Sequence, residues 1–258
     1  MKLTLCGDFH ITEKKPESRR DDYFQSSLQK LQYIICTSIK EKSSIILQPG
    51  DFFDRPSVPY SLTSTIISFL RKSPITWYVV AGQHDLKFRN KGNTALDVLV
   101  AGEIVKNSER TVLSESVFLY SVSYNESIPE IITEGFNILM IHKMIVEEKI
   151  WEGQVEYEWA NTILRRTKYD LIISGDNHKS FFVEHKGRHL LNCGSLMRSS
   201  RDQIDHKPCF VIYDTKRRNY EICYIPVKPA SEVFDMTRIE VEKERDEKLM
   251  AFVDGLIE

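Results

Sequence analysis

Five short apolar segments of the chain each end in a polar turn that carries aspartate or histidine, and this recurrence constrains the fold more than any other feature. Each segment is five or six residues long, which is typical of a buried strand rather than of a helix. The segments and their turns are 2–6 with Gly7-Asp8-Phe9-His10, 44–48 with 49–54, 76–80 with Gly82-Gln83-His84-Asp85, 136–141 with His142, and 169–174 with 175–178. Helical periodicity separates the first three segments, from about residue 22 to 42 and from about 61 to 72. This strand-turn-helix order predicts an α/β fold with a parallel sheet.

The pattern changes in the last third of the chain. Four hairpin-like strands are expected at 181–184, 189–192, 209–214 and 220–225, which predicts an antiparallel portion of sheet. The proline-flanked stretch 226–229 indicates a boundary, so we expect one domain over 1–228 and an extension over 229–258. The extension is predicted to hold a strand at 237–241 and a helix whose apolar face is formed by Leu249, Phe252, Val253, Leu256 and Ile257.

Composition excludes several classes of protein. The chain has 258 residues with 35 basic and 37 acidic side chains, so its net charge of -2 gives no global signal for nucleic-acid binding. Its longest apolar runs, such as 45–47 and 98–101, are far below the roughly 20 residues that a membrane helix needs. Polar residues follow the N-terminus too early for a secretory signal, and the five cysteines lack a C-x-x-C spacing. We therefore expect a cytoplasmic protein, in the host cytoplasm if a phage encodes it.

The polar turns together predict a metal site. Strands of one sheet place their ends on the same edge, so these side chains are expected to meet there. Carboxylate, amide and imidazole groups suit hard or borderline divalent ions. The candidate ligands are Asp8, His10, Asp51, Gln83, His142, Asp176 and His178. This is more than one ion takes, which predicts two ions about 3.5–4 Å apart with Asp51 between them, an arrangement used for in-line hydrolysis of phosphate esters.

The order of these blocks resembles the five signature blocks of the calcineurin-like metallophosphoesterases over roughly residues 5 to 200. Within that superfamily the chain is similar to the SbcD-type nuclease subunits of bacterial and phage double-strand-break repair complexes. Three stretches carry this finer resemblance: 19–22, 50–54 and 192–200. The resemblance implies a four-layer α/β/β/α sandwich of two mixed sheets flanked by helices.

The resemblance also implies roles for individual residues. Asp8, His10 and His178 would hold the first ion, Asp51 would bridge, and His142 would hold the second. The implied ions are two divalent cations, Mn²⁺ in the first place and Mg²⁺ as the alternative.

His84 would face the scissile phosphate and stabilise the transition state or protonate the leaving oxygen, with Asp85 orienting its ring. Asp54 is expected either to contact the ligands without binding an ion itself or to be a structural turn residue. The sequence departs from the family at two positions, where Gln83 replaces the usual Asn and Asp176 replaces the usual His. We hypothesise that the second site consequently favours Mn²⁺ or Mg²⁺ over softer ions. The alternative is a one-metal or inactive site.

The first functional hypothesis is a Mn²⁺-dependent exo- or endonuclease that serves DNA repair and recombination. The resemblance implies a homodimer and an SbcC-type, SMC-like ATPase partner. Basic residues near the polar turns could contact the DNA backbone, namely Arg19, Arg20, Lys87, Arg89 and Arg198. Two alternatives remain at this point: a small-molecule phosphomonoesterase or cyclic-nucleotide phosphodiesterase, and a DNA-binding scaffold subunit with weak catalysis. The chain ends after the beginning of the family's cap, so it is either part of a longer protein or a short member.

Overall fold

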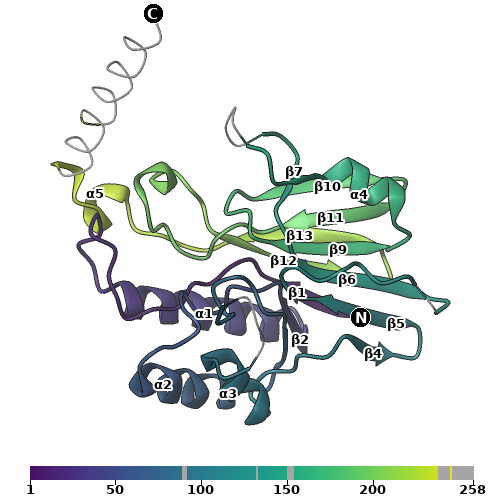
Figure 1. Cartoon of the computed structure of the whole chain (residues 1–258), viewed down its shortest axis with the longest axis horizontal. Helices are drawn as coiled ribbons and strands as arrows, with labels where there is room; N and C mark the ends of the chain where they lie inside the picture. Colours follow the sequence, from purple (N-terminus) through teal and green to yellow (C-terminus); the bar gives the residue numbers. More distant parts are fainter. Residues whose placement is uncertain (89–91, 132, 150–153, 238–244, 246–258) are drawn as a thin grey trace, which may run out of the picture.

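The protein folds into two mixed β-sheets that pack face to face, with helices on the outer face of each sheet (Figure 1). The structure is a computed structural model that describes residues 1–88, 92–131, 133–149, 154–237 and 245. The layers follow the order helices, sheet, sheet, helix, which is the four-layer α/β/β/α arrangement that the sequence resemblance implied. The fold class is thereby confirmed.

The first sheet has five strands in the order β13-β12-β1-β2-β3. Their bounds are Lys2–Leu5 (β1), Ile45–Gln48 (β2), Thr76–Val79 (β3), Cys209–Asp214 (β12) and Asn219–Tyr224 (β13). The first three strands are parallel, and β12 runs antiparallel to both β1 and β13. Because β1, β2 and β3 are parallel, their carboxyl ends lie at one edge of this sheet.

The second sheet has six strands in the order β10-β11-β9-β6-β5-β4. Their bounds are Arg110–Ser114 (β4), Val117–Val122 (β5), Phe136–His142 (β6), Leu171–Gly175 (β9), Phe181–His185 (β10) and Arg188–Asn192 (β11). The strands β5, β6, β9 and β11 form a parallel centre, with antiparallel neighbours at both edges. A separate parallel pair is formed by β7 (Ile145–Val146) and β8 (Glu158–Trp159).

Side chains that alternate along each central strand explain the layers. In β2, Ile46 packs against the helices while Leu47 packs between the sheets. In β6, Met140 faces the space between the sheets while Leu139 faces the outer helix layer. Successive residues of a strand point to opposite faces, so a strand buried on both faces must be apolar at nearly every position. This is why the sequence shows continuous apolar runs here.

The helices cover the outer faces. The first sheet is covered by α1 (Tyr23–Lys40), α2 (Tyr60–Arg71) and α3 (Ala95–Ala101), and the second by α4 (Ala160–Arg166). The side chain of Asp22 caps α1 by accepting from the backbone N–H of Gln25, and Thr94 with Asp97 forms a capping box at α3. None of the helices in the described part of the chain has the length and apolar character that a membrane span requires.

Two sequence expectations about the sheets need correction. The five metal-site segments do not belong to one sheet, because β1, β2 and β3 lie in the first sheet and β6 and β9 in the second. The four hairpin-like strands do not form one antiparallel portion either. The pair β10 and β11 joins β9, while β12 and β13 join β1. The physical reason is that a strand's apolar pattern reports burial and does not identify its neighbour.

The predicted extension is described only in part. Its first residues form α5 (Ala230–Val233), and the buried ring of Phe234 packs beside Arg19 of the main body. Residues 238–241 of the expected strand, and the expected helix with its apolar face, lie outside the described residues. The boundary at 228 therefore stays a prediction.

Candidate metal centre

The polar turns of the two sheets meet at one edge of the sandwich. The backbone N–H of Asp176, after β9, donates to Asp8 Oδ2, after β1, over 2.9 Å. The Nδ1–H of His142, at the end of β6, donates to the carbonyl oxygen of Pro49, after β2, over 2.8 Å. Each bond joins one sheet to the other. The side chains predicted as ligands therefore lie close together, and two facing sheets rather than one sheet bring them there.

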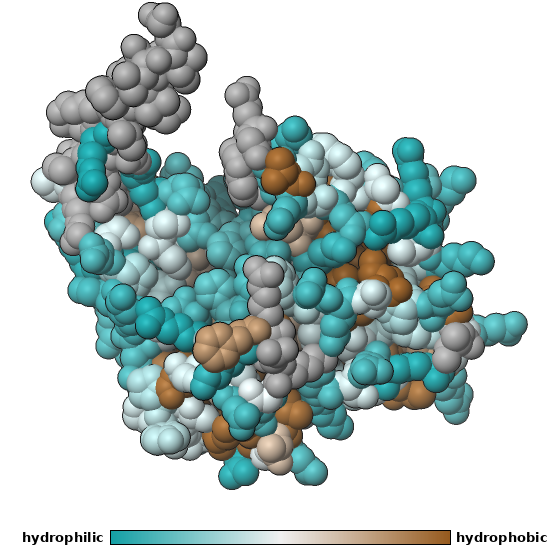
Figure 2. All heavy atoms as spheres, in the orientation of Figure 1, coloured by the Kyte–Doolittle hydropathy of each residue, from teal (hydrophilic) through white to brown (hydrophobic). Residues whose placement is uncertain are grey.

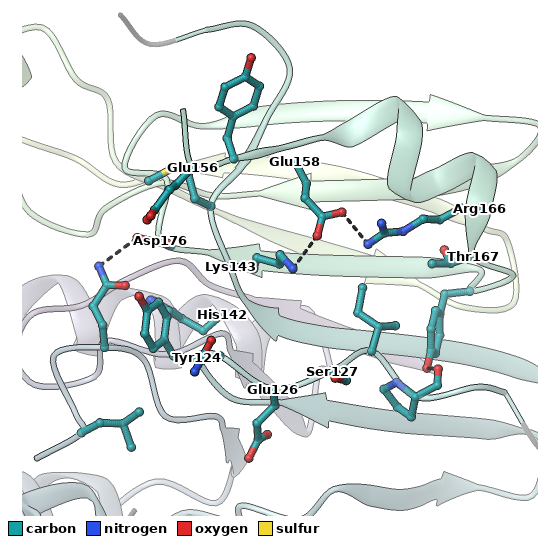
Figure 3. A pocket seen from close by; sticks show the side chains of 18 of the residues that line it. Tyr124, Glu126, Ser127, His142, Lys143, Glu156, Glu158, Arg166, Thr167 and Asp176 are labelled. Atoms are coloured by element: carbon teal, nitrogen blue, oxygen red, sulfur yellow. Dashed lines mark hydrogen bonds and ion pairs between the residues drawn. The ribbon is translucent and has the colours of Figure 1, made fainter. Parts of the chain in front are cut away.

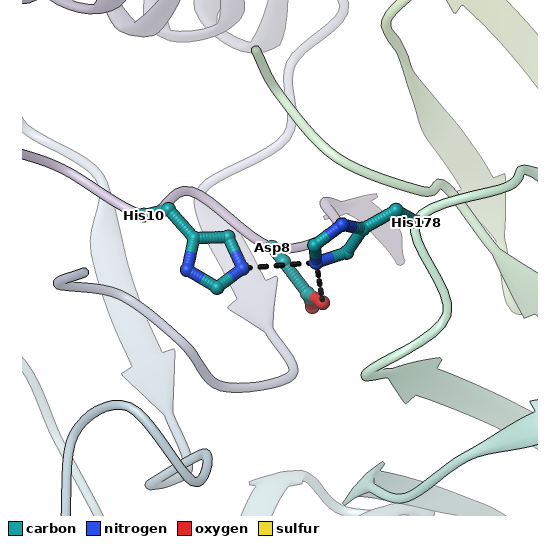
Figure 4. A group of neighbouring side chains, drawn as sticks. All are labelled: Asp8, His10 and His178. Carbon is teal, nitrogen blue, oxygen red and sulfur yellow. Dashed lines mark hydrogen bonds and ion pairs between the residues drawn. The ribbon is translucent and has the colours of Figure 1, made fainter. Parts of the chain in front are cut away.

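Three of the predicted ligands form a compact group at this edge, Asp8, His10 and His178 (Figure 4). The Nε2 atoms of the two histidines are 3.0 Å apart, and His178 Nε2 is 3.7 Å from Asp8 Oδ2. Two imidazole nitrogens at right angles around a metal ion, each about 2.1 Å from it, would be about 3.0 Å apart. The spacing of the two rings therefore fits a shared divalent cation.

Asp51 lies between two histidines. Its Oδ2 is 3.6 Å from His10 Nε2 and 3.5 Å from His142 Nε2. Because Nδ1 of His142 donates to a carbonyl, its Nε2 is the nitrogen that faces Asp51. This position, between the first group and His142, is the one that a bridging carboxylate would need.

Three buried ligand atoms have no hydrogen-bond partner among the described residues: Asp8 Oδ1, Asp51 Oδ2 and His142 Nε2. A buried polar atom without a partner costs about 1–3 kcal/mol, and more when it is charged. All three atoms are of the kinds that bind divalent cations. The residues present therefore fit a metal centre, because bound cations would coordinate atoms that have no hydrogen bond within the described part of the protein.

The backbone is strained at three of the residues of the centre. His10, Asp51 and Asp176 have φ angles of 46°, 50° and 78°, in the left-handed region that costs energy for residues other than glycine. Two glycines allow the close approach. A Cβ on Gly82 would meet Asp51 Oδ1 well inside contact distance, and one on Gly175 would lie 2.6 Å from Asp8 Oδ1.

The ionisable groups of the centre perturb one another. Burial raises the pKa of Asp8 well above its ordinary range and lowers the pKa of His10 to about 3. Burial also opposes the charge on Asp51, but the positive potential of His142 and the other histidines lowers its pKa to about 2. Burial favours neutral His142, yet Asp51 raises its pKa to about 10. The carboxylate of Asp51 thus stabilises a positive charge on the neighbouring His142, and it would stabilise a bound cation in the same way.

His84 lies next to the first group, with its ring centroid 4.7 Å from that of His10. Its backbone N–H donates to Asp51 Oδ1 over 2.8 Å, and its Nδ1–H donates to the backbone carbonyl of Asp54 over 2.9 Å. The predicted orientation of this ring by Asp85 is wrong. The carboxylate of Asp85 is buried and accepts from the backbone N–H groups of three other residues, namely Phe52, Phe53 and Gly82.

Asp54 lies behind the centre, next to His84 and His10. Its carbonyl fixes the ring of His84, and its Oδ1 lies 3.9 Å from His10 Nδ1. The Gly-Asp-x-x-Asp spacing of 50–54 was the available signal. It did not show that the backbone carbonyl of Asp54, rather than its side chain, would contact His84.

Gln83 and Asp176, the two departures from the family pattern, contact each other. The amide Nε2 of Gln83 donates to Asp176 Oδ1 over 3.0 Å. Both residues line the cavity on the His142 side of the centre. The longer amide side chain therefore reaches the carboxylate that stands in place of the usual histidine, so the two departures form one unit.

A large open cavity of about 1680 Å³ adjoins the centre at Gln83, His142 and Asp176 (Figure 3). Glu158 lies in its wall between two cations, 2.5 Å from Lys143 and 2.5 Å from Arg166. The acidic residues that line the cavity are Glu126, Glu130, Glu156, Glu158 and Asp176. The basic residues that line it are Lys143, Arg166 and Lys168. The viewed face of the molecule is mostly hydrophilic, with hydrophobic residues in small separate groups (Figure 2).

The residues predicted to contact DNA differ in their exposure to solvent. Arg19 and Arg198 are only 4% and 5% exposed and donate to protein acceptors, so they offer little surface to a DNA backbone, and that role stays a prediction. Arg20 is exposed and paired with Asp235, and Lys87 is exposed. Arg89 lies outside the described residues.

The paired sheets carry a centre rich in histidine and aspartate, which is the chemistry of a divalent-metal site. A family model of the calcineurin-like phosphoesterases matches residues 1–180, and the chain belongs to that family. No curated protein sequence matches the chain significantly.

Solved structures share the fold at low sequence identity. An archaeal phosphodiesterase is 13% identical with a TM-score of 0.50, and the match covers 87% of this chain and 100% of that one. A dimetal phosphatase from Danio rerio is 10% identical with a TM-score of 0.53, and the match covers 87% of this chain and 99% of that one. At such identities the likeness concerns the fold.

Proposed function

We propose that this protein is a two-metal phosphodiesterase that cleaves DNA, as an SbcD-type nuclease subunit. The observation that carries the phosphoesterase part is the set of three unpartnered buried ligand atoms, on Asp8, Asp51 and His142, next to the His10–His178 pair. The DNA substrate rests on the sequence resemblance in 19–22, 50–54 and 192–200. The open cavity beside the centre also gives a polymer access.

Each residue of the centre has a defined task in this proposal. Asp8, His10, His178 and Asp51 would hold one divalent ion, and Asp51 and His142, with the Gln83–Asp176 pair, would hold the other. When bound, the two ions would polarise the phosphate and activate water for in-line attack.

His84 acts on the phosphate itself. Its Nδ1–H is committed to Asp54, which fixes the ring and leaves Nε2 to contact the phosphate. When the ring is protonated on both nitrogens, its Nε2–H can stabilise the developing charge or transfer its proton to the leaving oxygen.

The proposal extends to cofactors and partners. The ions are Mn²⁺ or Mg²⁺, because oxygen ligands outnumber nitrogen ligands on the Gln83–Asp176 side. The protein would act as a homodimer with an SbcC-type, SMC-like ATPase in the cytoplasm, where Arg20 and Lys87 supply exposed charge for the DNA backbone.

The test is the His84→Ala variant, assayed on linear and single-stranded DNA with Mn²⁺. Removal of one group that stabilises or protonates the transition state costs roughly 10²-fold or more in turnover. Metal stoichiometry by calorimetry should not change, since no ligand is removed. His185→Ala, at the end of β10 remote from the centre, is the control and should cleave as wild type does. Undiminished cleavage by His84→Ala would disprove its assigned role.

A second candidate function is hydrolysis of a small phosphodiester or phosphomonoester. The cavity of about 1680 Å³ directly beside the centre supports it, because a small ester could be enclosed there. The two candidates separate when a chromogenic phosphodiester is compared with plasmid DNA. Cleavage of the small ester alone supports the second candidate. Salt-sensitive DNA binding without any Mn²⁺-dependent cleavage would instead indicate a scaffold subunit.

A further inference from the structure

A second cavity, of about 230 Å³, lies between α1 and the segment that follows β13 and shares no lining residue with the metal centre. Its lining includes four basic residues, Arg19, Lys30, Arg198 and Lys228, and we call it the cationic pocket. We propose that the cationic pocket binds a small dianion of the phosphate class, either inorganic phosphate or the phosphate group of a monoester. This proposal is independent of the reaction at the metal centre.

The charge balance of the pocket carries the first step. Arg19, Lys30 and Arg198 are each at least nine-tenths buried. Asp21 compensates Arg19 with two hydrogen bonds, of 2.8 and 2.7 Å. The ammonium of Lys30, in contrast, donates to a neutral acceptor, the carbonyl of Leu196, over 2.8 Å. Arg19 thus has a carboxylate partner in this pocket, and Lys30 has a carbonyl.

Arg198 is held by neutral acceptors as well. Its two terminal nitrogens donate to the carbonyl oxygens of Ile204, over 3.1 Å, and Lys228, over 2.6 Å. Its Nε is buried and has no hydrogen-bond partner among the described residues. A guanidinium can only donate hydrogen bonds, so this N–H needs an acceptor. An oxyanion oxygen in the pocket would provide it.

The charge of the pocket indicates the charge of the ligand. Asp21 and Asp205 offset part of the positive charge through space, but the hydrogen bonds of Lys30 and Arg198 go to neutral carbonyls, so an anion beside these two cations is favoured. Burial, together with the positive charges of Arg19 and Arg198, lowers the pKa of Lys30 to about 7, which agrees with an excess of positive potential at this place. Phosphate and its monoesters carry about -1.5 to -2 near neutral pH.

Size and access point to the same class of ligand. The volume of about 230 Å³ lies below the roughly 300–1,000 Å³ of cavities that hold drug-sized molecules, so a small anion fits best. Gln29, Tyr33 and Val227 line the same cavity and are exposed, which opens it to solvent. The ring of Phe234 lies 5.2 Å from the guanidinium of Arg19 and 5.7 Å from that of Arg198, and this contact holds both groups in place.

The test uses the full chain after removal of metal ions with a chelator, so that phosphate cannot bind through metals. Calorimetric titration with inorganic phosphate, and separately with AMP, is run against chloride at equal ionic strength. We expect saturable binding with one ligand per chain. Whichever of the two binds more tightly identifies the member of the class. Binding of neither ligand overturns the proposal.

The matched variants are Lys30→Met, which removes one of these two cations at nearly constant shape, and Lys207→Met, an exposed lysine outside the pocket. Lys30→Met should weaken binding at least tenfold, and Lys207→Met should leave it unchanged. Circular dichroism confirms that both variants are folded. His178→Ala should bind as wild type does, because it alters only the metal centre. Equal affinity in Lys30→Met and wild type, or loss of binding in His178→Ala, would place the anion elsewhere.

Discussion

The pairing of Gln83 with Asp176 gives a physical reason for two otherwise separate departures from the family pattern. A histidine at 176 would offer one nitrogen ligand, whereas the carboxylate offers two oxygens, of which Oδ1 accepts from Gln83 at 3.0 Å. The second oxygen could then bind a cation. Hard oxygen donors favour Mn²⁺ and Mg²⁺ over Zn²⁺. In the proposed two-metal centre, the two residues would therefore set the preference of the second ion together.

We predict that Asp176→His shifts the metal preference of the second site toward Zn²⁺ and weakens Mn²⁺ binding about tenfold or more. The variant loses an oxygen ligand and leaves the Gln83 amide without its acceptor. Combining it with Gln83→Asn should recover part of the loss, because contacting residues are not additive. Calorimetric titration with Mn²⁺ and Zn²⁺ measures this. An unchanged stoichiometry and metal ranking in both variants would refute the pairing argument.

At the scale of elements, the loops after β2 and β3 carry much of the centre, and Asp85 joins them. Its buried carboxylate accepts from the N–H groups of Phe52 and Phe53 in the first loop and of Gly82 in the second. The first loop holds Asp51, and the second holds His84. The side chain of Asp85 therefore fixes the position of the two loops relative to each other.

Asp85→Ala should destabilise the fold by about 2–4 kcal/mol, since three buried donors lose their acceptor at once. Asp85→Asn keeps one oxygen acceptor and should cost less. Urea unfolding of the metal-free variants gives both values. If Asp85→Ala stays within about 0.5 kcal/mol of wild type, the carboxylate does not hold the loops together.

Lys30 on the helix α1 is a buried basic residue that affects how the stability of the protein depends on pH. Burial and the nearby Arg19 and Arg198 lower the pKa of Lys30 to about 7, well below the ordinary lysine value. Between these two pKa values the unfolded chain binds a proton that the folded chain does not. Lys30 therefore makes stability rise with pH in that window, by at most about 1.4 kcal/mol per unit. Below about pH 7 both states are protonated and the dependence ends.

Lys30→Met should remove this pH dependence and be more stable than wild type near about pH 6. The difference should shrink toward about pH 9. Urea unfolding in phosphate-free chloride buffers gives the two stability profiles. Parallel profiles for variant and wild type would show that Lys30 does not titrate in this window.

At the scale of the whole molecule, the sequence predicted the strands that carry the centre but not how they divide between sheets. Segments 2–6, 44–48 and 136–141 were found because strands buried on both faces are apolar throughout. Because such strands are apolar at every position, their sequences do not show which strand lies next to which. The helices α3 and α4 went unpredicted because their apolar patterns are only seven residues long, and β5 went unpredicted although it is a six-residue apolar strand.

Individual side chains show the same limit. Arg19 and Arg198 were read as surface residues because arginine is rarely buried, yet both are enclosed. The Gln83–Asp176 bond and the carbonyl contact of Asp54 with His84 depend on side-chain placement. No spacing in the sequence encodes that placement.

The central claim is that ligands from both sheets assemble a two-metal centre around Asp51. The most direct test is anomalous diffraction from a crystal soaked in Mn²⁺. We predict two peaks about 3.5–4 Å apart on either side of Asp51. One should lie among Asp8, His10 and His178, and the other beside His142. A single peak, or none, at this edge of the sandwich would contradict the account.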